Sequence, residues 1–310
     1  MRVAFFGTSE FAVPVLRALT GSAHAVAPVV TAPARPSGRG RKLVPSPVEN
    51  EARALGLTVL TPESPNDPAF VVELASLQPD VAVLAAYGYI LRLPLLRLPR
   101  HGFLNVHPSL LPRYRGAAPI QRALLAGEQE TGVTVISLCE QVDAGDIVEQ
   151  AAVSVGPDET AGELSQRLAT AGAGMVLDAL ARLDKGTLSR TPQDPKLATR
   201  AHKIAKSERN VDWREPAPQI HNRIRALSPE PGAVTSFRAR RLVLLRSRLH
   251  PFPGRGEPGQ LLVQHAGLVV AAGSGAVEIT ELKPEGSRVQ TGQDFRNGNR
   301  PAPGERFVTA

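Results

Sequence analysis

The sequence is poor in cysteine and in aromatic residues. Cys139 is the only cysteine among 310 residues, so an intrachain disulfide is excluded, and the apolar run before it predicts a buried thiol. Aromatic residues make up 4% of the chain and hydrophobic residues 42%, which predicts a globular protein with an aliphatic core. A single cysteine and no close-spaced His or carboxylate set argue against a zinc site. We therefore expect a metal-free protein of a reducing compartment.

Long apolar runs are also missing. No segment approaches the roughly 18 apolar residues that a membrane span requires. The N-terminus reaches the polar residues 7–10 before an apolar stretch of signal-peptide length can form. These absences predict a cytoplasmic protein.

Acidic residues are missing from one stretch. Residues 1–200 carry 19 basic and 19 acidic residues, whereas residues 201–310 carry 17 and 10, so the net charge of +7 falls in the last third of the sequence. Between Val234 and Gly256 there is no acidic residue among six arginines: Arg238, Arg240, Arg241, Arg246, Arg248 and Arg255. Such a cluster predicts a polyanion-binding surface. A basic face that serves only solubility remains the alternative.

The first half of the chain alternates between apolar runs and helical segments. A strand, a glycine turn and a helix occupy residues 2–21. Further strands are predicted at 25–30, 58–60, 81–85, 102–105, 131–138 and 147–155, with helices at 47–55, 68–77 and 119–125. This order predicts a Rossmann-like α/β domain with a mainly parallel sheet and helices on both sides. Pro28 weakens the second strand because proline cannot donate to the ladder.

The second half has a different pattern. A long helix is predicted over residues 158–183, with Gly172 and Gly174 as weak points, and a polar, proline-containing stretch follows it. A helix is predicted at 216–227. After it come short segments in which apolar and polar residues alternate, separated by glycine-containing turns, at 233–237, 242–245, 260–264, 268–272 and 277–282. They predict a small β-barrel resembling the oligonucleotide-binding fold. The predicted organisation is residues 1–188, a linker at 189–205, and a barrel domain at 206–310.

One predicted strand ends in an amide and an imidazole. Asn105 and His107 lie two residues apart, so extended backbone points both side chains the same way. Pro108 cannot continue a central strand, which places the pair at the carboxyl end, where open α/β sheets bind ligands. Asp143, in a turn before another strand, gains significance only beside this histidine. The turn at residues 7–9 lacks the later glycines of a dinucleotide loop, so it is either a tight turn or part of a ligand pocket.

These residues lie in motifs that resemble the formyltetrahydrofolate-dependent transferase family. The motifs are NVHPSLLPRYRGAAPIQ at 105–121, TGVTV at 131–135 and DAGDI at 143–147. The resemblance implies catalysis by Asn105, His107 and Asp143, with 10-formyltetrahydrofolate as co-substrate and no metal. It also implies folate contacts from AYGYIL at 86–91 and from the loop after His107, namely Tyr87, Gly88, Ile90, Ser109, Leu110, Leu111 and Pro112.

Two further segments resemble the members of that family that formylate methionyl-tRNA. RPSGRGRKLVPSPV at 35–48 resembles their basic loop, and VDW at 211–213 with IHNRIRALSPEPGA at 220–233 resembles the start of their C-terminal domain. Two positions depart from the family pattern: Tyr114 stands where the family more often has tryptophan, and Glu230 stands where a second tryptophan or another aromatic residue is usual. The resemblance implies initiator methionyl-tRNA as the partner, and we expect a monomer without an obligate protein partner. The expected tRNA contacts are Arg35, Arg39, Arg41, Lys42, Arg238, Arg240, Arg246 and Arg248.

Two other functions stay open. The same three residues suit formyl transfer to an amino group of a nucleotide or nucleotide-sugar, or hydrolysis of formyltetrahydrofolate, although the arginine-rich segments oppose both. A non-catalytic RNA-binding protein with a vestigial transferase fold is the third possibility. The intact Asn105, His107 and Asp143 oppose it.

Overall fold

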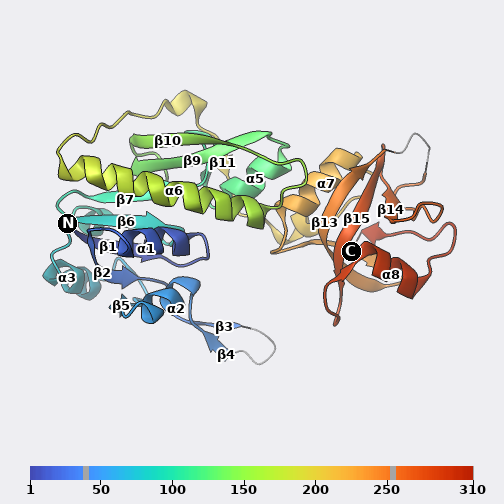
Figure 1. The fold of residues 1–310 in the computed structure, drawn as a ribbon, viewed down its shortest axis with the longest axis horizontal. Helices are drawn as coiled ribbons and strands as arrows, with labels where there is room; N and C mark the ends of the chain where they lie inside the picture. The colour runs from blue at the N-terminus through green and yellow to red at the C-terminus, as the bar shows by residue number, and fades with distance from the viewer. Residues whose placement is uncertain (38–41, 252–255, 310) are drawn as a thin grey trace. The chain divides into compact units, whose positions relative to one another are not determined.

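The computed structural model describes residues 1–37, 42–251 and 256–309 (Figure 1). The chain divides into two compact units. Unit 1 comprises Met1–Ala117, Thr131–Val153 and Ser165–Ala201, and unit 2 comprises Ala118–Glu130, Ser154–Leu164 and His202–Ala310. Unit 2 therefore includes two short segments, 118–130 and 154–164, that lie between parts of unit 1 in the sequence.

Unit 1 is built on a seven-stranded sheet of order β10-β9-β7-β6-β1-β2-β5. Strands β5, β2, β1, β6 and β7 pair in parallel, and β7 pairs antiparallel with β9. The mainly parallel α/β sheet is thus confirmed. The strands are β1 (Arg2–Gly7), β2 (Ala25–Val30), β5 (Val59–Leu60), β6 (Val81–Ala85), β7 (Phe103–His107), β9 (Glu130–Ser137) and β10 (Ile147–Ser154).

Pro28 is accommodated within β2 by a change of register. Val3 pairs with Val26 and Phe5 with Val29, so β2 has one residue more than β1 between these pairs. Such a bulge leaves one position outside the ladder. The strand forms despite its proline, as predicted.

The helices of unit 1 follow the predicted ranges closely. They are α1 (Ala12–Thr20), α2 (Pro47–Ala54), α3 (Pro68–Ser76) and most of α6 (Ala161–Asp184). The short helix α4 (Leu93–Leu96) was not predicted. Ser46 and Asp67 cap α2 and α3, each followed by proline at the first helical position. Gly172 of α6 lies against β7, where a Cβ would be 2.4 Å from Cγ1 of Val106. The predicted weak point is therefore a place of close packing between helix and sheet.

Unit 2 contains an antiparallel sheet that forms a half-barrel, of order β14-β15-β13-β12-β17, with β16 paired to β15. Its core includes Trp213, Phe237, Phe295 and Phe307. The strands are β12 (Ala233–Phe237), β13 (Arg240–His250), β14 (Leu268–Ala271), β15 (Ala276–Pro284), β16 (Gln290–Thr291) and β17 (Val308–Thr309), and the helices are α5 (Pro119–Leu125), α7 (Ala217–Ala226) and α8 (Gly292–Asn299).

The smaller elements lie in loops. β3 (Arg35–Ser37) and β4 (Lys42–Val44) form an antiparallel hairpin, and β8 (Arg115–Gly116) pairs in parallel with β11 (Arg200–Ala201). Short 3₁₀ helices cover Pro195–Leu197 and Lys206–Arg209.

Three sequence predictions are wrong in detail. The range 260–264 makes only two isolated bridges, because Gln260 pairs with Arg306 and Leu261 with Val270. Helix α8 was not predicted, although Thr291 caps it by accepting from Asp294 N. Cys139 is exposed rather than buried, because β9 ends at Ser137 and the chain has already left the sheet.

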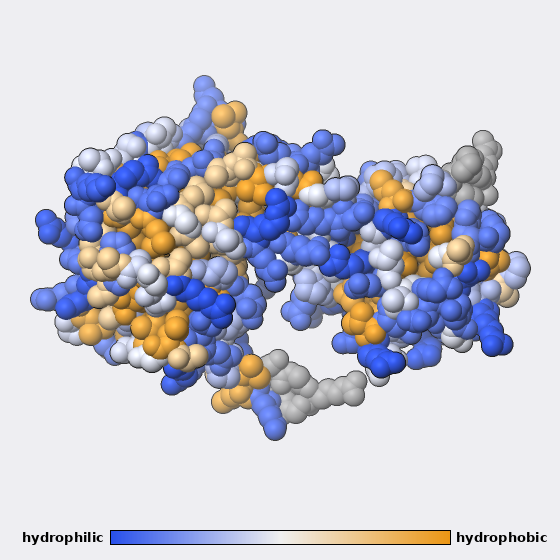
Figure 2. All heavy atoms as spheres, in the orientation of Figure 1, coloured by the Kyte–Doolittle hydropathy of each residue, from blue (hydrophilic) through white to orange (hydrophobic). Residues whose placement is uncertain are grey.

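The surface of unit 2 is predominantly polar. On the face shown in Figure 2, hydrophilic residues cover most of this unit and apolar residues appear only as small separate groups. In the part of the chain that the structure describes, no helix combines the length and the apolar character needed to cross a membrane.

Candidate active site

The structure brings the three predicted catalytic residues together. Asn105 and His107 lie on β7, and Asp143 faces them from the turn between β9 and β10. Asn105 Nδ2 donates to Asp143 Oδ1 at 3.4 Å, and His107 Nδ1 lies 3.5 Å from Asp143 Oδ2. Asn105 and His107 are 5% and 4% exposed. An amide, an imidazole and a carboxylate thus meet at the carboxyl end of a central strand.

Both ring nitrogens of His107 face oxygen acceptors. Nδ1 faces the carboxylate of Asp143, and Nε2 lies 3.0 Å from the backbone oxygen of Tyr114. An N–H on either ring nitrogen therefore has an oxygen acceptor within reach. Tyr114 adopts φ 61°, in the left-handed region, so its carbonyl is presented by an uncommon backbone conformation.

The turn that carries Asp143 is held by its neighbours. Asp143 itself adopts φ 52°, and its Oδ2 accepts from the backbone N–H of Gly116 at 2.9 Å. Gly145 is required for close approach, because a Cβ there would lie 1.7 Å from the oxygen of Ser137. The side-chain amide of Gln193 donates to the backbone oxygens of Asp143 and Gly145, at 2.9 and 2.6 Å.

Gln193 belongs to the stretch that the sequence indicated as a linker. Thr191 exchanges two 2.8 Å backbone hydrogen bonds with Ile147, and Thr199 accepts from the N–H of Tyr114 through Oγ1 at 2.8 Å. The segment 190–201 therefore packs against the turn and loop of the site. Sequence reasoning missed Gln193 because Pro192, Pro195 and polar neighbours without periodicity carry no signal for such a contact.

A cavity of about 530 Å³ lies next to the carboxyl ends of β1, β2 and β6. Tyr87 and Gly88, two of the predicted folate contacts, line it. Thr8 of the glycine turn also lines it and donates to the oxygen of Tyr87 at 2.9 Å, which favours the ligand-pocket interpretation of that turn. The lining residues are Thr8, Ser9, Glu10, Ala32, Pro33, Arg35, Val44, Pro45, Ser46, Pro47, Ala86, Tyr87, Gly88 and Tyr89.

The other predicted folate residues do not line this cavity. Ile90 is 67% exposed, and Ser109 and Leu111 are buried in the loop after β7. Ser109 Oγ donates to the oxygen of Arg113 at 2.7 Å, which shapes that loop. Leu110 and Pro112 are partly exposed.

Tyr87 lines the cavity with a side chain whose hydroxyl is unsatisfied within the described part of the chain. Its hydroxyl is buried and has no hydrogen-bond partner among the described residues. Burial raises the pKa of Tyr87 well above its usual value, and the nearby Tyr89 raises it further. The ring packs edge-on against Phe6, with centroids 5.4 Å apart.

The predicted tRNA contacts of the basic loop are only partly described. Arg35 and Lys42 lie on the exposed β3–β4 hairpin, and Arg35 also lines the cavity beside Tyr87. Arg39 and Arg41 lie outside the described residues.

The arginines of unit 2 differ in how their charges are balanced. Arg238 occupies the turn between β12 and β13, at φ 49°, and both of its hydrogen bonds to Glu305 are 2.7 Å long. Arg248 donates to Glu278 at 2.8 Å, and Arg246 pairs with Glu163. The hydrogen bond from Arg246 is the main reason that the pKa of Glu163 falls to about 2.

Arg240 has no ion pair with any described residue and is exposed at the start of β13. Carboxylates that are absent from 234–256 along the chain thus lie in space beside three of the six arginines, namely Arg238, Arg246 and Arg248. Counted by unit, the formal charge is +4 for unit 1, with 18 basic and 14 acidic residues, and +3 for unit 2, with 18 and 15.

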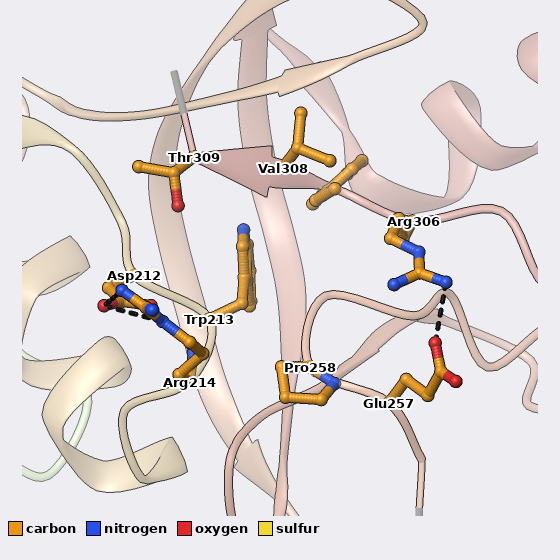
Figure 3. A pocket seen from close by; sticks show the side chains of 9 residues that line it. Asp212, Trp213, Arg214, Glu257, Pro258, Arg306, Val308 and Thr309 are labelled. Atoms are coloured by element: carbon orange, nitrogen blue, oxygen red, sulfur yellow. Dashed lines mark hydrogen bonds and ion pairs between the residues drawn. The ribbon is translucent and has the colours of Figure 1, made fainter.

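A second cavity, of about 400 Å³, lies in unit 2 beside Trp213 (Figure 3). Two ion pairs flank it, Arg214 with Asp212 at 2.7 Å and Arg306 with Glu257 at 2.6 Å. Since each arginine is balanced by its own carboxylate, this cavity presents no net charge and no catalytic grouping. No cluster of three or more His, Cys, Asp or Glu side chains suited to a metal occurs within the described ranges.

Comparison with known proteins adds to this geometry. Residues 1–180 match the family described as Formyl transferase, and residues 203–300 match Formyl transferase, C-terminal domain. The chain belongs to the formyl transferase family.

Relatives in the formyl transferase family are similar over their full lengths. The methionyl-tRNA formyltransferase of Jannaschia sp. is 46% identical over 98% of this chain and 99% of its own, and that of Aromatoleum aromaticum is 45% identical over 100% and 98%. HypX from Aquifex aeolicus in complex with tetrahydrofolic acid shares the fold, with a TM-score of 0.68 and 20% identity over 96% of this chain and 47% of its own.

Proposed function

We propose that the chain transfers the formyl group of 10-formyltetrahydrofolate to the α-amino group of initiator methionyl-tRNA, which supplies formylmethionyl-tRNA for translation initiation. The observation that carries this proposal is the convergence of Asn105, His107 and Asp143 at the end of β7 in a chain that matches methionyl-tRNA formyltransferases from end to end. The 45–46% identity to proteins named methionyl-tRNA formyltransferase favours a tRNA over a nucleotide or nucleotide-sugar as acceptor.

The three side chains divide the chemistry of acyl transfer between them. Addition of the methionyl amine to the formyl carbon places negative charge on the formyl oxygen. One N–H of Asn105 Nδ2 and the Nε2–H of His107, once released from the backbone oxygen of Tyr114, donate to this oxygen and stabilise its charge. Asp143, 3.5 Å from His107 Nδ1, orients the imidazole and takes the proton that the attacking amine loses. It relays this proton to N10 of tetrahydrofolate, which leaves when its bond to the formyl carbon breaks.

The cavity at the ends of β1, β2 and β6 is the proposed position of the folate co-substrate. Its volume of about 530 Å³ falls within the usual range for a small-molecule site. The ring and backbone of Tyr87, together with Gly88, supply its wall. The hydroxyl of Tyr87 is buried away from solvent and contributes no hydrogen bond to a ligand in this arrangement.

The surface that binds tRNA is proposed to be basic and to act mainly through electrostatic attraction to phosphates. Arg35 and Lys42 of the hairpin, with Arg39 and Arg41 that lie between them in the sequence, would contact the acceptor arm, and the arginines of unit 2 would contact phosphates. Of the four predicted contacts in unit 2, Arg240 is the one best able to do so, because Arg238, Arg246 and Arg248 already bind carboxylates. We further expect a cytoplasmic monomer, the state in which such an enzyme meets free aminoacyl-tRNA.

The test follows a labelled formyl group. Purified protein is incubated with 10-formyltetrahydrofolate carrying a labelled formyl carbon and with initiator methionyl-tRNA, and label attached to the methionyl amine is measured. N-acetylmethionyl-tRNA, whose amine is blocked, is the matched control. Transfer to the free amine alone supports the proposal. Release of labelled formate without transfer would instead indicate a hydrolase.

A further inference from the structure

The segment 190–201 holds one side chain in contact with the catalytic turn. Gln193 Nε2 donates to the backbone oxygens of Asp143 and Gly145, at 2.9 and 2.6 Å. Its Oε1 accepts from Arg115 Nε at 3.0 Å and from Arg115 Nη2 at 2.6 Å. A glutamine side chain has two N–H donors and an oxygen with two lone pairs. All four hydrogen-bonding positions of Gln193 are therefore used.

This set of partners permits one orientation of the amide. Rotation by 180° would place Oε1 against two carbonyl oxygens and the NH₂ group against a guanidinium, and every contact would then be unfavourable. The segment that presents Gln193 is itself fixed at both ends, by the bridge from Thr191 to Ile147 and by the pairing of β11 with β8. Gln193 thus connects three parts of unit 1 rigidly.

Asp143 depends on such support. Its backbone is in the left-handed region, at φ 52°, which is uncommon for a residue other than glycine. Its carboxylate lies 3.4 Å from Asn105 Nδ2 and 3.5 Å from His107 Nδ1, at the long end of useful contact distances. A displacement of the turn by about 1 Å would break these contacts, and errors of that size cost catalysts about 10²-fold in rate.

We propose that Gln193 is a positioning residue for formyl transfer: by holding the backbone oxygens of Asp143 and Gly145 against Arg115, it sets the carboxylate of Asp143 against Asn105 and His107. This inference rests on the proposed function, because it concerns the rate of that reaction. The residue works through Asp143 and makes no contact with the reacting atoms.

The two variants that test it differ in what they remove. Gln193→Ala removes both the donors and the acceptor. Gln193→Glu keeps oxygens for Arg115 but directs a carboxylate at two carbonyls, and it preserves the size of the side chain. We expect each to lower kcat by about 10- to 100-fold, with the KM values of both substrates within about twofold of wild type. Asp194→Ala is the matched control, because this neighbouring carboxylate accepts only from the N–H of Lys196 and should leave kcat unchanged.

A double-mutant cycle separates positioning from general stability. If Gln193 acts through Asp143, Gln193→Ala or Gln193→Glu should change kcat by less than about twofold in the Asp143→Ala background. A similar loss in both backgrounds, or a wild-type kcat in Gln193→Glu, would overturn the inference. Wild-type protein that transfers no formyl group would overturn the proposed function instead, so the two failures are distinguishable.

Discussion

At the scale of single residues, the catalytic assignment depends on three side chains that act on the same negative charge, the one that forms on the formyl oxygen. Asn105→Ala, His107→Ala and Asp143→Ala should each lower kcat by roughly 10² or more, because each removes a donor or proton partner for the same oxyanion. Binding of initiator tRNA, measured by filter retention, should stay near the wild-type value. Double substitutions should cost less than the sum of the single losses in free energy. A variant with wild-type kcat would remove its residue from the mechanism.

A second residue-scale prediction concerns the hydroxyl of Tyr87. This hydroxyl is buried without a partner among the described residues, so Tyr87→Phe should stabilise the protein by about 1 kcal/mol through removal of an unsatisfied polar group. Thermal unfolding with and without folate checks this, with Tyr89→Phe as the control that should bring no gain. The KM for 10-formyltetrahydrofolate should be unchanged. A large rise in that KM would show that the hydroxyl binds the co-substrate.

The site residues differ in how well sequence could reveal them. Asn105 and His107 follow from the period of two in a strand that Pro108 ends, and Asp143 was recognised through the family motif. Gln193 was not found, since its contacts are with backbone oxygens distant in the chain and its own surroundings have no periodic pattern. The unpaired state of Arg240 was equally hidden, because ion pairs such as that of Arg246 with Glu163 arise only in the folded chain.

At the scale of elements, the prediction for tRNA selection concerns the β3–β4 hairpin and the sequence between its two strands. Arg39→Ala should lower kcat/KM for initiator methionyl-tRNA by about tenfold or more, the effect of one charge-assisted hydrogen bond to phosphate. Folate binding should be unaffected. Leu43→Ala, an uncharged change at an exposed position of the same hairpin, is the control and should retain wild-type kcat/KM. Equal values for wild type and Arg39→Ala would mean that the charges of the hairpin serve only solubility.

Elements were predicted well where burial and periodicity agree. β2, β6 and α5 have the predicted bounds, because continuous apolar runs and proline at a helix start are local signals. The range 260–264 and α8 failed, because edge pairing and a short polar helix depend on tertiary partners. β12 and the turn after it also fall where they were predicted, although Arg238 and Ala239 both adopt positive φ in this turn without the usual glycine.

At the scale of the whole molecule, charge is distributed more evenly than the sequence indicates. The acidic residues of the segments 118–130 and 154–164 join the arginine-rich C-terminal part, so unit 2 carries +3 rather than the whole +7. These segments also pack within unit 2, for example through the ion pair of Arg122 with Glu208. A truncation near residue 203 would expose them, so substitutions in the full chain are the better probe of tRNA binding.

The corresponding prediction uses salt dependence. Arg240→Ala should reduce the slope of log affinity for tRNA against log salt concentration by about 0.7 to 0.9, because one phosphate contact and its counterion release are lost. Initiator and elongator tRNA should be affected alike, since phosphate contacts carry no sequence information. Arg248→Ala is the matched control on the same strand, and its slope should change less because Glu278 already binds that guanidinium. Identical slopes for all three proteins would indicate that β13 does not contact the tRNA.

The most direct test of the central claim is the choice of acceptor. With 10-formyltetrahydrofolate as donor, kcat/KM is measured in parallel for initiator methionyl-tRNA, elongator methionyl-tRNA, glycinamide ribonucleotide and a nucleotide-linked amino sugar. We predict that initiator methionyl-tRNA exceeds both small acceptors by roughly 10² or more, because only tRNA engages the basic hairpin and unit 2 as well as the catalytic residues. Preference for either small acceptor, or no transfer to any of the four, would contradict the account.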